Sequence, residues 1–229
     1  MTAPSIARER HAMSAGLRAG GVGGLVFVVL GVVAGAAVPP PPEADASASK
    51  IRTYLVDHGS SLRFMALGTA IAALGLVVFF AVLRRAVVAT EDDRPWADAL
   101  FGFGLLTVAV STVGSVLLSV NAHLAARSVS DDVVQVAFRV GSAVFFTAPG
   151  ITMTGALLVA AMLATRGGIL PKWSAALATI AAVLGLLSST LDLLTDSGSP
   201  AALGLGGFLL TVVWTAAISV AMLRADGTS

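Results

Sequence analysis

The chain has 229 residues, of which 56% are hydrophobic and 12% charged, and its mean hydropathy is +0.91. About a quarter of the residues in soluble domains are charged, so this composition excludes an ordinary water-soluble domain. A net charge of +1 without a basic tract argues against a nucleic-acid partner, and the absence of cysteine excludes disulfides, thiolate metal sites and thiol nucleophiles.

The apolar residues fall in blocks of about 20, and each block is long enough to cross about 30 Å of hydrocarbon at about 1.5 Å per residue. Helices are expected because strands with an open edge would leave unpaired backbone groups in lipid. We therefore predict one all-α membrane domain over residues 1–229, a bundle of six transmembrane helices. The predicted spans are about 20–38, 64–83, 97–120, 140–165, 173–194 and 204–223.

The positions of Lys and Arg predict the orientation, because cations close to a span resist translocation. Nine of them flank the side that carries the termini and five flank the other side, so we expect both termini in the cytoplasm. The nine are Arg8, Arg10, Arg18, Arg84, Arg85, Arg94, Arg166, Lys172 and Arg224, and the five are Lys50, Arg52, Arg63, Arg127 and Arg139.

The first span has an alternative interpretation as a cleaved secretory signal. Arginines precede the apolar run 22–33, and Ala34-Gly35-Ala36 resembles a small-residue cleavage site. Cleavage would leave five spans. The length of the run to Val38 and the even number of spans favour a retained helix, and sequencing of the mature N-terminus tests this.

Glycine pairs in the first span predict close helix packing. Gly20 with Gly24, and Gly31 with Gly35, have the four-residue spacing that lets another helix approach. We expect these contacts within the chain rather than in a homodimer.

The outer loop, residues 39–63, begins with Pro39–Pro42 as a stiff polyproline segment. A short amphipathic helix is expected next, capped by Ser47 or Ser49 and stopped by Gly59. Its apolar face carries Ile51, Tyr54 and Leu55. We expect it to rest on the membrane surface or to cap the bundle.

This region also carries a family resemblance. The residues are Asp45-Ala46-Ser47-Ala48 with Ile51, Tyr54, Leu55, Asp57 and His58, between a first span and a second that ends in Arg84-Arg85. In this layout the chain resembles the small six-span integral membrane proteins of actinobacteria whose function is not established. The resemblance implies a six-helix bundle in the plasma membrane and gives no catalytic residues to carry over.

The third span carries a polar stripe at helical spacing: Thr107, Ser111, Ser115 and Ser119. Such hydroxyls usually hold membrane helices together, which is the interpretation that we favour. A solute path lined by Ser111 and Ser115 is the alternative.

Two charges, Arg139 and Asp192, are placed near the outer edge of the hydrocarbon. Asp192 is 19 residues from Trp173, which corresponds to a height of about 28 Å. Charges at this depth are costly unless they are paired or snorkel to the headgroups, so a contact between Arg139 and Asp192 is one hypothesis and snorkelling is the alternative. In the fourth span, Pro149-Gly150 could break the helix and open a cavity, although proline kinks are routine in membrane helices.

No catalytic set is recognisable in the sequence. All glutamates lie in aqueous segments, and metalloprotease, phosphate-loop and serine-hydrolase motifs are missing. A metal site between His58 and His123 is not favoured over solvated histidines, and no cofactor is expected. The favoured function is a non-enzymatic accessory or structural membrane protein, in contact with lipid and with an unidentified membrane partner. The alternative is a small-solute or ion transporter whose polar path runs near Ser111, Ser115, Arg139 and Asp192.

Overall fold

The computed structural model describes residues 3–42, 46–166, 170–194 and 201–225, and over these it is helical with no strand. Asp45, part of the motif quoted above, lies outside the described residues. The elements are α1 (Ala3–Ala36), α2 (Ala48–Asp57), α3 (Gly59–Ala86), η1 (Glu91–Asp93), α4 (Arg94–Ala125), α5 (Asp131–Ser142), η2 (Ala143–Thr147), α6 (Ala148–Arg166), α7 (Trp173–Leu194) and α8 (Ala201–Ala225).

Six of the helical segments are long and apolar enough to cross a membrane, which confirms the predicted all-α fold with six spans. They are Ser14–Ala36, Gly59–Ala86, Glu91–Ala125, Asp131–Arg166, Trp173–Leu194 and Leu203–Ala225. Their outer faces carry large apolar side chains, such as Leu67 and Leu74, which are 62% and 69% exposed in the isolated chain. Lipid would cover such a surface, so this is the architecture of a multi-pass membrane protein.

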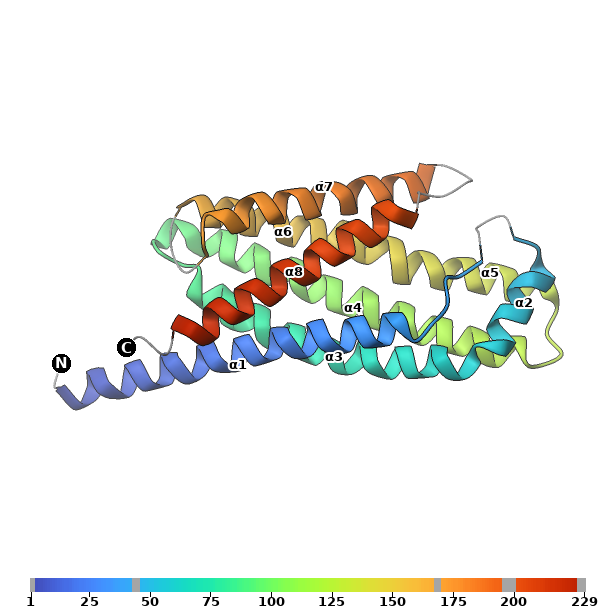
Figure 1. Cartoon of the computed structure of the whole chain (residues 1–229), viewed down its shortest axis with the longest axis horizontal. Coiled ribbons are helices and arrows are strands. Elements are labelled where there is room, and N and C mark those ends of the chain that lie inside the picture. The colour runs from blue at the N-terminus through green and yellow to red at the C-terminus, as the bar shows by residue number, and fades with distance from the viewer. Residues whose placement is uncertain (1–2, 43–45, 167–169, 195–200, 226–229) are drawn as a thin grey trace.

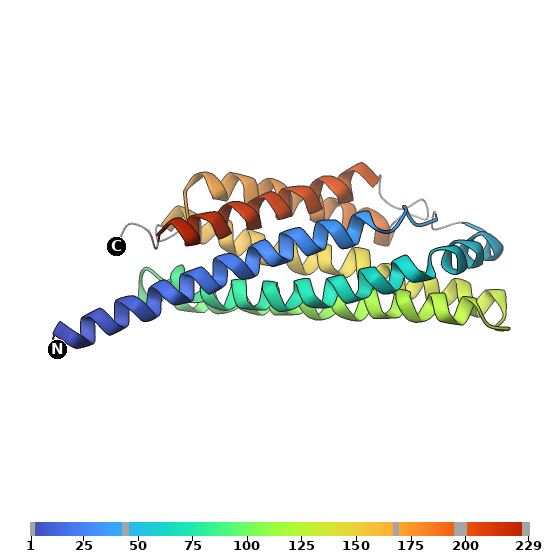
Figure 2. The ribbon, with the colours of Figure 1, turned by 60° about the horizontal axis from the view of Figure 1, so that its bottom comes forward.

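The six spans form a closed ring in which each helix packs mainly against two neighbours. The order around the ring is α1, α3, α4, α6, α7 and α8, and α8 returns to α1. Figures 1 and 2 show the N- and C-termini at one end of this ring and α2 at the other. We call these the terminal end and the cap end. The cap end consists of residues 37–42, α2, α5 and the last turns of α4.

Aromatic side chains fill the ring toward its terminal end. Phe79 and Phe80 on α3 are fully buried, and the Phe79 ring meets Trp214 of α8 edge-on with centroids 6.1 Å apart. Gly104 on α4 leaves room for Phe80, since a Cβ there would lie 2.6 Å from Cγ of the ring. Large rings are therefore accommodated opposite small residues, as close packing requires.

The glycine prediction for α1 is confirmed for one pair only. A Cβ on Gly20 would lie 2.7 Å from Val82 Cβ, and one on Gly24 would lie 2.7 Å from the Phe79 ring. A Cβ on Gly31 or Gly35 would meet nothing within 4 Å. The first pair therefore packs tightly against α3 and α8, whereas Gly31 and Gly35 do not face a neighbouring helix, although Ala34 beside them packs against Gly68 of α3.

The fourth span differs from its prediction at both its start and its middle. The helix begins at Asp131, and its axis continues through α5, η2 and α6 to Arg166. Pro149 does not break it. A π-helical turn over residues 143–147 comes just before the proline, which has no N–H and whose ring crowds the carbonyl four residues back. In place of the predicted break, the helix is continuous and contains one wider, π-helical turn.

Candidate binding site at the cap end

The four residues predicted to form a site are not joined to one another. Within the described ranges, no hydrogen bond or ion pair links any two of Ser111, Ser115, Arg139 and Asp192. Ser115 is fully buried, and its hydroxyl donates to Thr112 O of its own helix at 2.9 Å. Ser111 and Asp192 are partly buried.

Arg139 lies farther from the terminal end than predicted. It is on α5, 27 residues before Arg166 along the continuous helix, or about 40 Å at about 1.5 Å per residue. Its side chain is exposed. Since the hydrocarbon core is about 30 Å thick, a helix that crosses it upright from Arg166 would place Arg139 outside it. The predicted ion pair between Arg139 and Asp192 is not formed in the described part of the chain.

Three hydroxyls inside the ring make contacts between helices. Thr107 Oγ1 of α4 lies 2.8 Å from Thr152 Oγ1 of α6. The hydroxyl of Thr154 on α6 is shared between Gly150 O of its own helix, at 2.7 Å, and Ala182 O of α7, at 3.2 Å. Ser189 of α7 similarly donates to Thr147 O at 3.1 Å. These bonds agree with the packing interpretation of the polar residues.

The cap end is organised around α2. This helix caps the bundle, which is one of the two arrangements predicted for it. Ser47 caps the helix, with its Oγ accepting from Lys50 N at 3.4 Å. Ile51 and Leu55 are fully buried. They belong to an apolar cluster that includes Leu62, Met65, Leu118, Ala122, Val134 and Phe138. The amphipathic helix is therefore part of the folded bundle.

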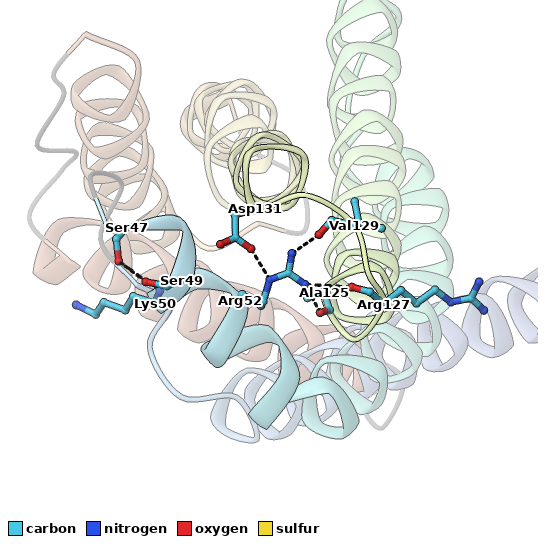
Figure 3. A network of polar contacts seen from close by, with 8 residues as sticks. All are labelled: Ser47, Ser49, Lys50, Arg52, Ala125, Arg127, Val129 and Asp131. Atoms are coloured by element: carbon cyan, nitrogen blue, oxygen red, sulfur yellow. Dashed lines mark hydrogen bonds and ion pairs between the residues drawn. The ribbon is translucent and has the colours of Figure 1, made fainter.

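Arg52 fixes α2 to the connection between α4 and α5 (Figure 3). Its Nε donates to Asp131 Oδ1 at 2.6 Å, and its terminal nitrogens donate to the carbonyls of Ala125 at 2.6 Å, Arg127 at 3.2 Å and Val129. Ala125 is the last residue of α4, where carbonyls lack partners within the helix. The cation thus satisfies the negative end of α4.

Tyr54, the only tyrosine, fixes the proline segment over α2. Its hydroxyl donates to Pro39 O at 2.9 Å, and its ring meets those of His58 and Phe138 with centroids 5.0 and 6.2 Å apart. Burial raises the pKa of Tyr54 to about 12, so the phenol stays protonated and donates at neutral pH.

Two adjoining pockets lie at the cap end, with Tyr54, Pro40 and Pro41 in the wall of both. The first is polar and open, has a volume of about 630 Å³, and includes Ser49, Lys50, Thr53, Asp57 and His58. The second has a volume of about 260 Å³ and is apolar. Its other walls come from Gly35, Val38, Pro39, Leu62, Met65, Leu118, Phe138, Phe145 and Phe146. Neither pocket includes Ser111, Ser115, Arg139 or Asp192.

Sequence reasoning missed Arg52 and the aromatic residues of α5 and η2. Two signals were present. Ser130-Asp131-Asp132 has the composition of a helix start, with a capping residue and two acids in the first turn. Val134 and Phe138, one helical turn apart, then form a buried stripe.

Comparisons with known proteins add no relative to this description, because no family model, curated protein or solved structure matches the chain.

Proposed function

We propose that this chain is a non-catalytic accessory protein of the plasma membrane that acts by binding through its cap end. The observation that carries the proposal is that two adjoining pockets lie at the cap end. Among the hydroxyls of the spans, those of Thr107, Thr154 and Ser189 contact neighbouring helices. In the proposed orientation the termini are cytoplasmic and the cap faces outward, in accord with the distribution of cations.

The cap has the properties of a binding surface. It is held in one shape by the Arg52 network and by the Tyr54 hydrogen bond. Preorganised sites bind more tightly because less ordering is required on association. Loosening the cap should therefore weaken binding without disturbing the ring.

The test combines capture with a flux measurement. We would crosslink the protein in native membranes and compare the wild type with Arg52→Ala and with Arg84→Ala, whose side chain pairs with Asp98 at the terminal end. A component lost only with Arg52→Ala supports the proposal. The proposal is overturned if reconstituted vesicles conduct protons or small ions above protein-free vesicles, and if Asp192→Asn abolishes that flux while thermal stability is kept.

A further inference from the structure

We propose that the apolar pocket at the cap end holds one acyl chain of a membrane phospholipid, and that the adjoining polar pocket holds its headgroup. This inference rests on the proposed function, since it names the ligand class of the same cap. Three observations carry it: the height of the apolar pocket, its opening toward the lipid, and its continuity with a charged pocket.

The height of the pocket follows from residue counts along three helices. Met65 is 20 residues from Arg85 on α3, Leu118 is 22 residues from Trp96 on α4, and Phe146 is 20 residues from Arg166. Each count corresponds to about 30 Å, which is the thickness of the hydrocarbon core. The pocket therefore straddles the boundary between acyl chains and headgroups on the cap side.

The wall of the apolar pocket lacks one side of the ring. Residues of α1, α3, α4, α5 and η2 line it, whereas no described residue of α7 or α8, which stand between η2 and α1 in the ring, does so. Gly35 and Phe146 line the pocket from α1 and η2, and both are exposed, Phe146 by 49%. An acyl chain could therefore enter the apolar pocket sideways from the leaflet without crossing a polar barrier.

The polar pocket supplies the groups that a phospholipid headgroup needs. The ammonium of Lys50 can pair with phosphate, and the carboxylate of Asp57 can accept from an amine or hydroxyl of the headgroup. The wall shared with the apolar pocket consists of Tyr54 and two prolines. One amphiphile can therefore occupy both pockets, with its apolar and charged parts each in a matching environment.

The volume of the apolar pocket limits how much of a lipid it can hold. About 260 Å³ is slightly below the range of about 300–1,000 Å³ for small-molecule sites, so the apolar pocket accommodates a segment of one chain rather than a whole lipid. The rest of the lipid would stay in the leaflet.

The experiment fills the pocket from a position that tolerates a side chain. A Cβ on Gly35 meets nothing within 4 Å, so Gly35→Leu should fold normally and project into the pocket. Gly31→Leu is the matched control, since it is one turn away, equally unhindered and not in the pocket wall. Equal thermal stability of the two variants verifies the match.

The probe is phosphatidylglycerol with a photoreactive group on its acyl chain, in nanodiscs of the same unlabelled lipid. We expect labelling of residues 138–146 in the wild type and in Gly31→Leu, and a loss of about fivefold or more in Gly35→Leu. We also expect Lys50→Ala to reduce this labelling, but not that by a diacylglycerol probe, which has no phosphate.

Three results would overturn the inference: equal labelling in both glycine variants, labelling spread evenly around the ring as for bulk lipid, or competition by a lipid-anchored peptide but not by phospholipid. Failure here is distinguishable from failure of the proposed function. Flux through vesicles tests only the latter, and cap-dependent capture of a protein without lipid labelling would leave the proposed function standing.

Discussion

Removing the Arg52 guanidinium should release α2 from the ring while leaving the six spans intact. The side chain is one-quarter exposed and makes four contacts to the connection between α4 and α5, three of them to backbone carbonyls. In Arg52→Ala these carbonyls lose their donor. The loss is local because Ile51 and Leu55 still face the apolar cluster.

The size of the effect follows from the kind of contact. The ion pair with Asp131, which is half exposed, contributes about 0–1 kcal/mol. Hydrogen bonds to a charged group contribute about 1.5–3 kcal/mol each, reduced here by partial exposure. We expect Arg52→Ala to weaken docking of α2 by about 2–4 kcal/mol, which is a factor of at least about 30 in the population of the open cap.

The assay is amide hydrogen exchange in nanodiscs, read by mass spectrometry for residues 48–57. Arg52→Ala should lower protection there by at least about 30-fold and leave α7 unchanged. Arg127→Ala is the matched control, because it removes a cation from the same connection while keeping the carbonyl that Arg52 contacts. Protection of α2 that is equal in the two variants would refute the assignment of Arg52 as the clamp.

Three further predictions concern packing, hydroxyl bonds and pH. Gly114→Ala should lower the thermal midpoint in detergent, by an amount equivalent to about 1–3 kcal/mol, because a Cβ would lie 2.6 Å from the Phe145 backbone. Thr154→Val should cost about 0.6–2 kcal/mol by the same measurement, since it removes the bond to α7. The stability difference between wild type and Tyr54→Phe should be constant below pH 10 and shrink as pH rises to about 12, because the folded state holds the phenolic proton more tightly.

Each of these has a control or a contradicting result. Gly102→Ala should be neutral, since a Cβ there meets nothing within 4 Å. Thr179→Val should also be neutral, because its exposed hydroxyl donates only within its own helix. Tyrosinate absorbance reports on Tyr54 alone, so ionisation near pH 10 in the folded protein would contradict the desolvation of its phenol.

The spans could be predicted because the bilayer imposes length and apolarity on each crossing helix, as for Trp173–Leu194, which matches its prediction. The helical turns that extend beyond the apolar runs could not be predicted in this way. Helix α4 has 32 residues, about 48 Å, and its last turns pack against α2. Hydropathy identifies the segments that lie in lipid. The helical conformation of these turns depends instead on contacts with residues far away in the sequence.

The contacts at the cap end could not be predicted, for a related reason. Ser115 and its neighbours form a visible stripe, but which helix the stripe faces depends on the order of helices in the ring. In the sequence, Arg52 is one of several outer cations. Its role depends on the position of α2 against the end of α4, which only the structure gives. Asp192 and Arg139 were paired by similar height alone, and α5 carries Arg139 beyond that height.

The cap and the termini should lie on opposite sides of a membrane that the chain crosses six times. Since the chain has no cysteine, single cysteines can be introduced directly: Ser128→Cys at the cap end, Ala89→Cys at the terminal end and Val113→Cys on the lipid-facing surface. With an impermeant maleimide on sealed cells, we predict that only Ser128→Cys is labelled, that Ala89→Cys requires permeabilisation, and that Val113→Cys stays unlabelled. Labelling of both ends in sealed cells, or of position 113, would contradict the account.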